Sequence, residues 1–275
     1  PRIRPRPMKQ TRPARPRKAP DRRIFFCIPA KIAVRTKRKA GGTMVRLEQI
    51  CKRYGKGSCC VDALREVSLR VDDGEFVSII GPSGSGKTTL MNILGCLDRP
   101  TSGRYFLAGQ PVERLQGREA DRTRAREIGF IFQSFQLIPT MTALENVELP
   151  LILQGQDRLS RRKAALQALE QVGLSQRKDH RPAQLSGGQQ QRIATARVLA
   201  ARPPLVLADE PTGNLDRETG LGILRLLEKL QYGGSTVIMI THDREIAARA
   251  PRILRMEAGR LFPAETSSPE GEQIR

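Results

Sequence analysis

From residue 44 onward, hydrophobic and polar positions follow patterns that predict alternating strands and helices. Apolar residues alternate with polar ones over 45–50 and 67–71, which is typical of half-buried strands in an antiparallel sheet. The short runs 76–80, 205–208 and 236–240 are almost continuously apolar. Runs of this kind are typical of central parallel strands that are covered on both faces. The pattern therefore predicts an α/β fold that contains both kinds of sheet.

Helical periodicity lies between these strands. Ser160 is the predicted N-cap of a helix that ends at Gly173. A second helix is predicted from Gln189 to about Ala201, because two prolines follow it. No run of uninterrupted apolar residues approaches the length of about 18 that a bilayer requires, so the sequence predicts no membrane-spanning segment.

Positive charge is concentrated near the N-terminus. The sequence has 48 Lys+Arg and 28 Asp+Glu, and residues 1–43 hold 15 of these bases, one acid and seven of the 19 prolines. Such a segment cannot bury enough apolar surface to fold by itself. It would suit an arm that binds nucleic acid or anionic lipid, whereas the apolar stretch 24–28 makes only a weak targeting sequence. Because the strand pattern begins at Met44, we expect residues 1–43 to be disordered or absent from the native protein.

Composition excludes other classes of protein. The chain is 4% aromatic and has no Trp, which argues against a binding surface built from aromatic platforms. Its five cysteines include no C-x-x-C pair, so neither a zinc site nor a disulfide framework is indicated.

The strongest chemical signal is the segment Gly81-Pro82-Ser83-Gly84-Ser85-Gly86-Lys87-Thr88-Thr89. It matches the phosphate-loop pattern G-x-x-x-x-G-K-[ST] and lies between a buried-type strand and a helical pattern, as that loop requires. The glycines let backbone N–H groups turn toward phosphate oxygens, and the helix N-terminus adds positive potential. We expect Lys87 to lie between the terminal phosphates and the Thr88 hydroxyl to hold magnesium.

A second signal is a pair of carboxylates at the end of a buried-type strand. Asp209 and Glu210 directly follow the apolar run 205–208. Asp209 is placed to organise magnesium and its water, whereas Glu210 would point elsewhere and polarise an attacking water.

The segment Leu185-Ser186-Gly187-Gly188-Gln189 narrows the assignment. Together with the phosphate loop and the two carboxylates, it resembles the ATP-binding subunits of ABC transporters. The resemblance covers nearly all of 44–262. It implies the fold of a phosphate-loop (P-loop) NTPase: a mostly parallel core sheet, an antiparallel β-subdomain and a helical subdomain at about 134–190. The implied ATP-binding domain is 44–265, followed by a flexible C-terminus at 266–275.

The same resemblance implies a homodimer. Ser186 and the two glycines after it expose a helix N-terminus, which is a second anion site. In the family, two subunits pack head to tail, so that the phosphate loop of one and this signature of the other enclose each ATP. One copy of each motif per chain therefore implies two chains per functional unit.

Further positions match the family one by one. Tyr54 matches the aromatic residue that stacks on adenine, and Gln133 matches the glutamine that touches magnesium and senses the membrane partner. Asp216 matches the aspartate that communicates across the dimer, and His242 matches the histidine that contacts the γ-phosphate. The implied catalytic residues are Lys87, Gln133, Glu210 and His242, and the implied magnesium-binding residues are Thr88, Gln133 and Asp209. The implied nucleotide-binding residues are Tyr54, Gly81, Pro82, Ser83, Gly84, Ser85, Gly86, Lys87, Thr88, Thr89, Gln133, Ser186, Gly187, Gly188, Gln189, Asp209 and Asp216.

The stretches 95–103, 137–147 and 208–216 are most similar to the ATPases of macrolide-exporter and lipoprotein-releasing systems. This implies an ATPase that drives a separate membrane permease with a large extracytoplasmic domain. It also implies a location in the cytoplasm, on the inner face of the cell membrane.

Two alternatives stay open. One is a nucleic-acid-associated ATPase of the same superfamily, which the basic tail favours. Chromosome-type members insert long coiled coils before the signature, whereas only 51 residues separate Gln133 from Leu185 here. We therefore expect no nucleic-acid partner. The other alternative is a regulatory binder without turnover, which the complete set of catalytic positions disfavours.

Overall fold

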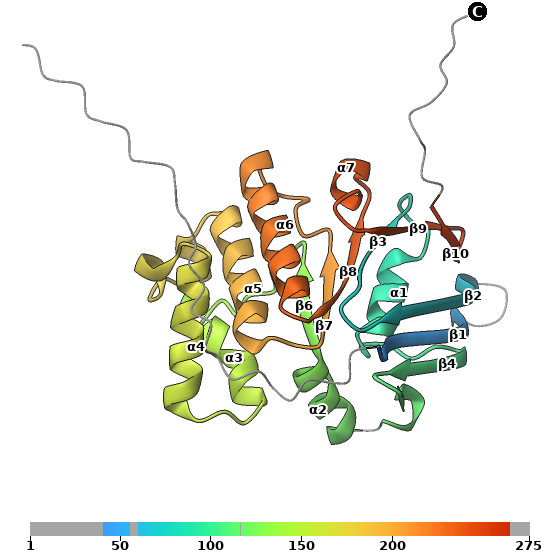
Figure 1. Cartoon of the computed structure of the whole chain (residues 1–275), viewed down its shortest axis with the longest axis horizontal. Coiled ribbons are helices and arrows are strands. Elements are labelled where there is room, and N and C mark those ends of the chain that lie inside the picture. The colour runs from blue at the N-terminus through green and yellow to red at the C-terminus, as the bar shows by residue number, and fades with distance from the viewer. Residues whose placement is uncertain (1–40, 56–59, 116, 265–275) are drawn as a thin grey trace, which may run out of the picture. The chain divides into compact units, whose positions relative to one another are not determined.

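The computed structural model describes residues 41–55, 60–115 and 117–264. The strands in these residues form two sheets (Figure 1). The predictions for residues 1–40 of the basic tail and for 266–275 lie outside the described residues. The described residues all belong to one compact unit. The predicted boundaries of the ATP-binding domain and its helical subdomain stay predictions.

The larger sheet has six strands in the order β10-β9-β3-β8-β7-β6. Every neighbouring pair is parallel except β9 and β10, so the sheet is mostly parallel, as predicted. In chain order the strands are β3 (Phe76–Ile80), β6 (Ile128–Phe132), β7 (Leu205–Asp209), β8 (Thr236–Thr241), β9 (Arg252–Glu257) and β10 (Arg260–Pro263).

The continuous apolar runs are explained by burial on both faces of this sheet. Leu205 and Leu207 of β7 belong to the hydrophobic cluster on one face, whereas Val206 and Ala208 belong to the cluster on the other. Side chains alternate between the two faces of a strand, so a strand covered on both sides needs apolar residues at every position.

The smaller sheet is antiparallel and has the order β2-β1-β4-β5, which confirms the predicted second kind of sheet. Its strands are β1 (Thr43–Tyr54), β2 (Val61–Asp72), β4 (Ser102–Leu107) and β5 (Gln110–Pro111).

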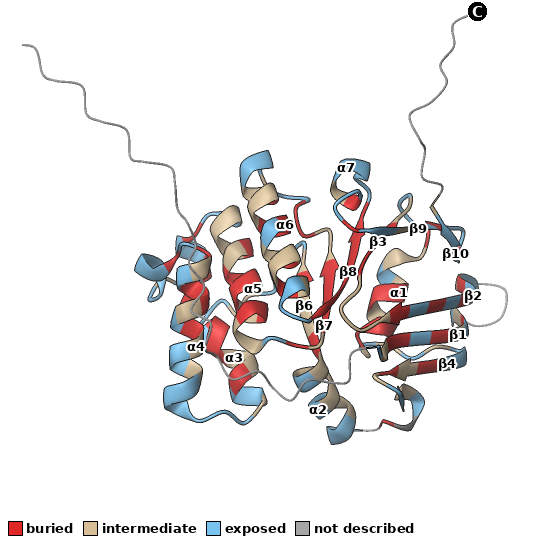
Figure 2. Ribbon diagram, in the orientation of Figure 1, coloured by how far each residue is buried: buried red, intermediate tan, exposed pale blue. Residues whose placement is uncertain are grey.

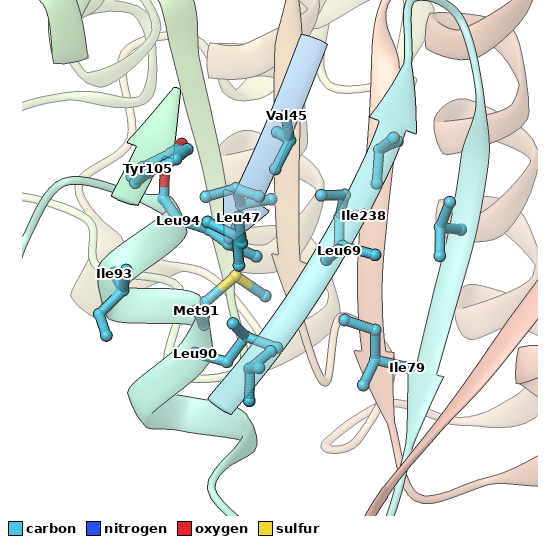
Figure 3. Close-up of a cluster of buried hydrophobic side chains, with 14 of the residues drawn as sticks. Val45, Leu47, Leu69, Ile79, Leu90, Met91, Ile93, Leu94, Tyr105 and Ile238 are labelled. Carbon is cyan, nitrogen blue, oxygen red and sulfur yellow. The ribbon is translucent and has the colours of Figure 1, made fainter. Parts of the chain in front are cut away.

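Figure 3 shows that α1 (Lys87–Leu94) shares a core with both sheets: Leu90 and Met91 meet Leu47 and Leu69, and Ile79 and Ile238 complete the cluster. The buried Tyr105 hydroxyl donates to the carbonyl oxygen of Leu94 at 2.7 Å. The helix that follows the phosphate loop is thus held between the sheets.

The remaining helices are α2 (Arg118–Glu127), α3 (Ala143–Leu153), α4 (Arg158–Gln171), α5 (Gly187–Ala201), α6 (Arg217–Tyr232) and α7 (Arg244–Ala247). Short 3₁₀ helices lie at Val112–Arg114, Ser175–Arg177 and Pro182–Gln184. Helices α3, α4 and α5 pack against one another, and their buried residues join the cluster on the second face of the core sheet. No helix in the described ranges has both the length and the apolar character needed to cross a membrane.

Two predicted helix starts are wrong. Helix α4 begins at Arg158 rather than after Ser160, because Asp157 is the N-cap and its Oδ1 accepts the amides of Leu159 and Ser160, both at 3.0 Å. The Asp157 carboxylate thus accepts the free amides of the first turn, and Ser160 lies within the helix rather than at its cap. Helix α5 begins at Gly187 rather than Gln189, because Ser186 caps it and the glycines form its first turn.

Candidate active site

Four of the candidate residues follow neighbouring strands of the core sheet. Strands β3, β8, β7 and β6 are adjacent and parallel, and the register pairs Ile80 with Thr241 and Asp209 with both Ile240 and Phe132. Carboxyl ends of parallel strands meet at one edge of a sheet, where open α/β folds bind their ligands. The residues that come next along the chain are Gly81, His242, Glu210 and Gln133. The structure thus brings together, at one edge, positions that lie up to 161 residues apart in the sequence.

The phosphate loop links β3 to α1 through backbone positions that require glycine. A Cβ atom on Gly81 would lie 2.3 Å from the carbonyl oxygen of Met256, which is far inside contact distance. Gly86 has a φ of 104° and leads directly into α1. The amide of Gly259 donates to the carbonyl oxygen of Ser85 at 3.0 Å. The turn between β9 and β10 therefore contacts the phosphate loop and helps to hold it in place.

Lys87 lies folded over this loop. Its Nζ donates to the carbonyl oxygens of Gly81 at 2.7 Å and Pro82 at 2.8 Å. Both partners are neutral acceptors, so an anion that enters the loop can replace them with charged oxygens, which form stronger hydrogen bonds. Thr88, the next residue, is exposed.

The two carboxylates after β7 have different surroundings. Asp209 is half-buried, and its burial raises its pKa; the neighbouring charge of Glu210 raises it further, and Lys87 opposes the shift. Glu210 turns toward the end of β8 through a left-handed backbone conformation with φ of 45°. Its Oε1 lies 2.8 Å from Nδ1 of His242, and its Oε2 accepts the Thr241 hydroxyl at 3.3 Å. Two neighbours therefore hold the Glu210 carboxylate in one orientation.

Gln133 connects the loops after β6 and β7. Its Nε2 lies 3.4 Å from Oδ1 of Asn214, and Nδ2 of Asn214 donates to the Gln133 carbonyl oxygen at 3.3 Å. The chain then turns through Phe135 and Gln136, both in the left-handed region. Arg197 of α5 donates to both of their carbonyl oxygens, at 3.0 and 2.9 Å. The loop that carries Gln133 is thus tied to α5.

The three predicted magnesium-binding residues offer only oxygen donors, from a hydroxyl, an amide and a carboxylate. The described residues contain no cluster of three His, Cys, Asp or Glu side chains that could hold a metal by themselves. Magnesium commonly takes only one or two carboxylates from a protein and completes its shell with waters and substrate phosphates. Burial also makes the Asp209 charge unfavourable unless a cation lies close to it. This donor set therefore fits magnesium that arrives together with a nucleotide.

Tyr54 lies beside the phosphate loop at the end of β1. The residue is 42% exposed, and its hydroxyl donates to Oδ2 of Asp98 at 2.8 Å. Burial and the Asp98 bond raise the Tyr54 pKa, while a hydrogen bond with Thr89 lowers it. The contact with Thr89 puts the exposed ring next to the start of α1.

The predicted second anion site is the start of α5. The Ser186 hydroxyl accepts the amide of Gln189 at 3.3 Å, and the Gln189 side chain accepts the amide of Ser186 at 3.0 Å. The Gln189 side chain is thus used within the cap, whereas Gly187 is exposed. A Cβ atom on Gly188 would lie 3.2 Å from Cγ2 of Thr219, and the backbone amide of Thr219 donates to Oδ1 of Asp216 at 3.0 Å. The starts of α5 and α6 therefore lie side by side.

The two predicted anion sites lie in different parts of the molecule. In Figure 1, α5 and α1 are separated by strands of the core sheet. The structure thus brings the phosphate loop together with Asp209, Glu210 and His242, and it places Ser186 and Asp216 with each other elsewhere.

Sequence reasoning missed several residues that hold this site. Asn214 bonds Gln133, and Arg197 fixes the loop after it. The buried Gln191 of α5 donates to the carbonyl oxygen of Pro211 at 2.8 Å and so connects α5 to the loop after Glu210. Thr241 could have been found, since it directly precedes His242 at the end of an apolar strand. Arg197 and Gln191 lie within a helix, and no local pattern marks them.

Comparison with known proteins gives a consistent result. The protein family described as "ABC transporter" matches residues 64–213. An ABC transporter ATP-binding protein of Thermotoga maritima is 51% identical over 218 residues, which cover 79% of this chain and 93% of the relative. The macrolide export ATP-binding/permease protein MacB of Brucella abortus is 50% identical over 227 residues, which cover 82% of this chain but 35% of the relative. The chain thus spans about a third of the length of that relative.

The solved structures include a similar chain of known nucleotide state. The ATP-binding cassette MJ0796, in a dimeric post-hydrolysis state bound to ADP and Pi, matches with a TM-score of 0.75 and 47% identity. The match covers 79% of this chain and 96% of that one.

Proposed function

Because the chain belongs to the ABC transporter family of ATP-binding proteins, we propose that it binds and hydrolyses ATP to drive an export or lipoprotein-release system. The observation that carries this proposal is the grouping of the phosphate loop, Asp209, Glu210 and His242 at the carboxyl edge of neighbouring parallel strands. A glycine loop that leads into a helix N-terminus binds phosphate, and carboxylates at the adjacent strand ends supply the groups that phosphoryl transfer to water requires.

The chain's own residues can be assigned to separate steps. The loop amides and Lys87 bind the terminal phosphates and stabilise negative charge on them. Glu210, held by Thr241 and His242, orients the attacking water and accepts its proton. His242 is exposed beside Glu210, so it can also donate to a phosphate oxygen at the mouth of the loop. Thr88, Gln133 and Asp209 would hold magnesium, which neutralises phosphate charge when bound.

We further propose that two copies of the chain share each nucleotide. The start of α5 exposes amides at Gly187, yet it lies apart from the phosphate loop of the same chain. The similar cassette MJ0796 is dimeric with ADP and Pi bound. A head-to-tail pair would place each signature opposite the partner's phosphate loop, with Tyr54 beside the base and Asp216 near the shared boundary.

The working partner in this proposal is a membrane permease with a large extracytoplasmic domain, and the ATPase lies on the cytoplasmic face of the membrane. The similar MacB protein is named as an ATP-binding protein and permease in one, and this chain corresponds to about a third of it. The exported or released molecule would be selected by the permease part.

Replacing Glu210 with Gln tests the catalytic assignment. The amide keeps the size of the side chain but cannot accept a proton, so ATP turnover should fall by about 100-fold or more. ATP binding should persist, because the phosphate loop is unchanged, and the dimer should accumulate in its ATP-bound form. Phosphate release and size-exclusion chromatography with ATP measure the two effects.

Glu245→Gln provides the matched control. Glu245 is exposed in α7, close in sequence to His242, and pairs only loosely with Arg217 at 3.8 Å. This variant should turn over ATP at the wild-type rate. Normal turnover by the Glu210 variant, or an equal loss in both, would contradict the assignment of Glu210.

A further inference from the structure

Helix α4 carries an exposed row of leucines and bases that the proposed ATPase chemistry does not use. Leu159 and Leu166 are seven positions apart, so they lie within about 20° of each other around the helix axis. Arg162 and Lys163 lie between them, three or four positions from each leucine, and therefore flank the row on its two sides. With Arg158 at the start of the helix, these five residues form what we term the α4 outer face.

The α4 outer face is open to solvent, although the helix has a well-packed inner side. Leu159 is 84% exposed and Leu166 is 38% exposed. Ala165, Ala168 and Leu169, on the other side, are buried against the helical cluster. Figure 2 shows exposed positions along α4 at the rim of this cluster. The leucines line a shallow hollow of about 470 Å³ together with the three bases.

The charges of this face are positive and mostly without internal partners. Nη1 of Arg162 lies 3.5 Å from Oε1 of the buried Glu148, so Arg162 forms an ion pair. In the part of the chain that the structure describes, Arg158 and Lys163 form no ion pair within 4.0 Å. Glu170, near the end of the helix, is the acid that also lines the hollow. The face thus combines protruding apolar side chains with unneutralised positive charge.

We propose that the α4 outer face contacts the anionic lipid surface of a membrane. A leucine that protrudes by most of its surface suits a soft layer that deforms around it, whereas a protein partner would need a matching socket. Bases beside it can reach lipid phosphates while their stems lie along the apolar boundary. Each such base near an anionic surface strengthens binding by about fivefold. The inference rests on the proposed function only in placing a membrane near this protein, and it needs neither ATP nor a permease.

The chain lacks Trp, which allows a local test. Leu159→Trp introduces a single Trp at the face, and Tyr232→Trp introduces one at an equally exposed position of α6, where Tyr232 is also 84% exposed. Both variants keep the full chain with its basic N-terminal segment, so general attraction to the vesicle is the same. With phosphatidylglycerol vesicles, the Trp emission of the Leu159→Trp variant should shift to shorter wavelength, and that of the Tyr232→Trp variant should not. Phosphatidylcholine vesicles should shift neither.

Charge removal completes the test. Adding Arg158→Gln or Lys163→Gln to the Leu159→Trp chain should raise the lipid concentration needed for half of the shift by about fivefold each. Arg225→Gln, at an exposed base of α6, should leave it unchanged. ATP turnover of these variants should stay at the wild-type rate, so failure here is distinguishable from failure of the ATPase assignment.

Three outcomes would overturn the proposal. The emission of the Leu159→Trp variant could fail to respond to anionic vesicles, or both Trp variants could respond equally. Polyglutamate, added in place of vesicles, could cause the same emission shift, which would indicate an acidic protein partner.

Discussion

Individual residues of the phosphate loop are fixed by close approach of backbone to backbone. The space where a Cβ of Gly81 would lie is occupied by the carbonyl oxygen of Met256. The neighbour is main chain in the core sheet, so no rotamer change can relieve the contact. Glycine at this position is therefore a steric requirement that precedes any contact with a nucleotide.

Gly81→Ala should accordingly destabilise the protein even without nucleotide. We expect a loss of about 1–3 kcal/mol in the free energy of unfolding, because β3 and β9 must move apart. Gly222→Ala is the control, since nothing lies within 4 Å of its added Cβ inside α6. That change should stabilise by about 0.4–1 kcal/mol. Urea denaturation measures both, and similar effects of the two variants would refute the steric argument.

Asp209 shows the opposite tendency, in which a functional group lowers stability. Burial and then Glu210 raise its pKa above the ordinary value, so the folded protein binds this proton more tightly than the unfolded chain does. The ionised carboxylate therefore destabilises the fold at neutral pH, and the penalty disappears as pH falls below the ordinary pKa.

Asp209→Asn should thus raise the melting temperature at pH 7 while abolishing magnesium-dependent turnover. The gain should shrink toward about pH 4, where the wild-type carboxyl is increasingly protonated. Thermal denaturation across this range provides the measurement. A gain that grows as the pH falls would show that the sign of the shift is wrong.

At the scale of elements, polar caps decide where helices begin. Ser186 and Gln189 cap α5 reciprocally, and Thr142 and Glu145 do the same for α3. Helix α4 has only the carboxylate of Asp157, which accepts two amides of its first turn. Hydrogen bonds to Ser160 hold the pKa of Asp157 below its ordinary value. That stabilisation is present above the unfolded pKa and is lost as pH falls through the folded pKa.

Replacing Asp157 with Ala should therefore lower the melting temperature at pH 7 by more than Ser160→Ala, which removes only the Ser160 hydroxyl and keeps the capping carboxylate. The first variant loses the carboxylate oxygen that accepts both free amides of α4, and the second retains it. The difference between the Asp157 variant and wild type should narrow in acid. If Ser160→Ala proved the more damaging change, Ser160 would be the effective cap after all.

At the scale of the whole molecule, the proposed function divides nucleotide binding between two predicted anion sites in different parts of the chain. The phosphate loop leads into α1, which is held between the sheets, and the signature begins α5 beyond the core sheet. Gln191 and Arg197 of α5 bond the loops after β7 and β6. Movement of α5 relative to the sheet would therefore shift the surroundings of both Glu210 and Gln133.

Mixing two inactive variants tests whether these parts act across a dimer. Lys87→Ala disables the phosphate loop, and Gly187→Glu places a negative charge at the exposed signature, where an acid also favours the helix start. Neither variant should hydrolyse ATP alone. In a 1:1 mixture, half of the dimers contain one intact composite site, so activity should return to about a quarter of wild type.

Two outcomes of the mixing experiment would contradict two independently active sites that are shared head to tail. Activity that stays at zero in an exchanged mixture would mean that one damaged site silences both. Full activity of the Gly187 variant alone would mean that each chain completes its own site.

Much of this protein is determined by local sequence alone. The alternating and continuous apolar runs identified antiparallel and parallel strands, because side-chain burial has the period of the strand itself. The position of the predicted phosphate loop between a strand and a helix could be predicted, since its glycines and its flanking elements are contiguous. The predicted starts of α4 and α5 differ from the observed ones by three and two residues. Several polar residues near each start could serve as the cap, and sequence does not say which one reaches the amides.

Only tertiary structure decided which distant groups meet. Strand order sets Glu210 beside Thr241 and His242, and sequence carries no record of that order for residues on separate strands. The loop that carries Gln133 is held by Arg197 of α5 and by Asn214 in the loop after β7, which are far from it in sequence. The burial that raises the Asp209 pKa likewise depends on how the chain packs. Local patterns report the period of burial, whereas contacts between elements depend on how the whole chain packs.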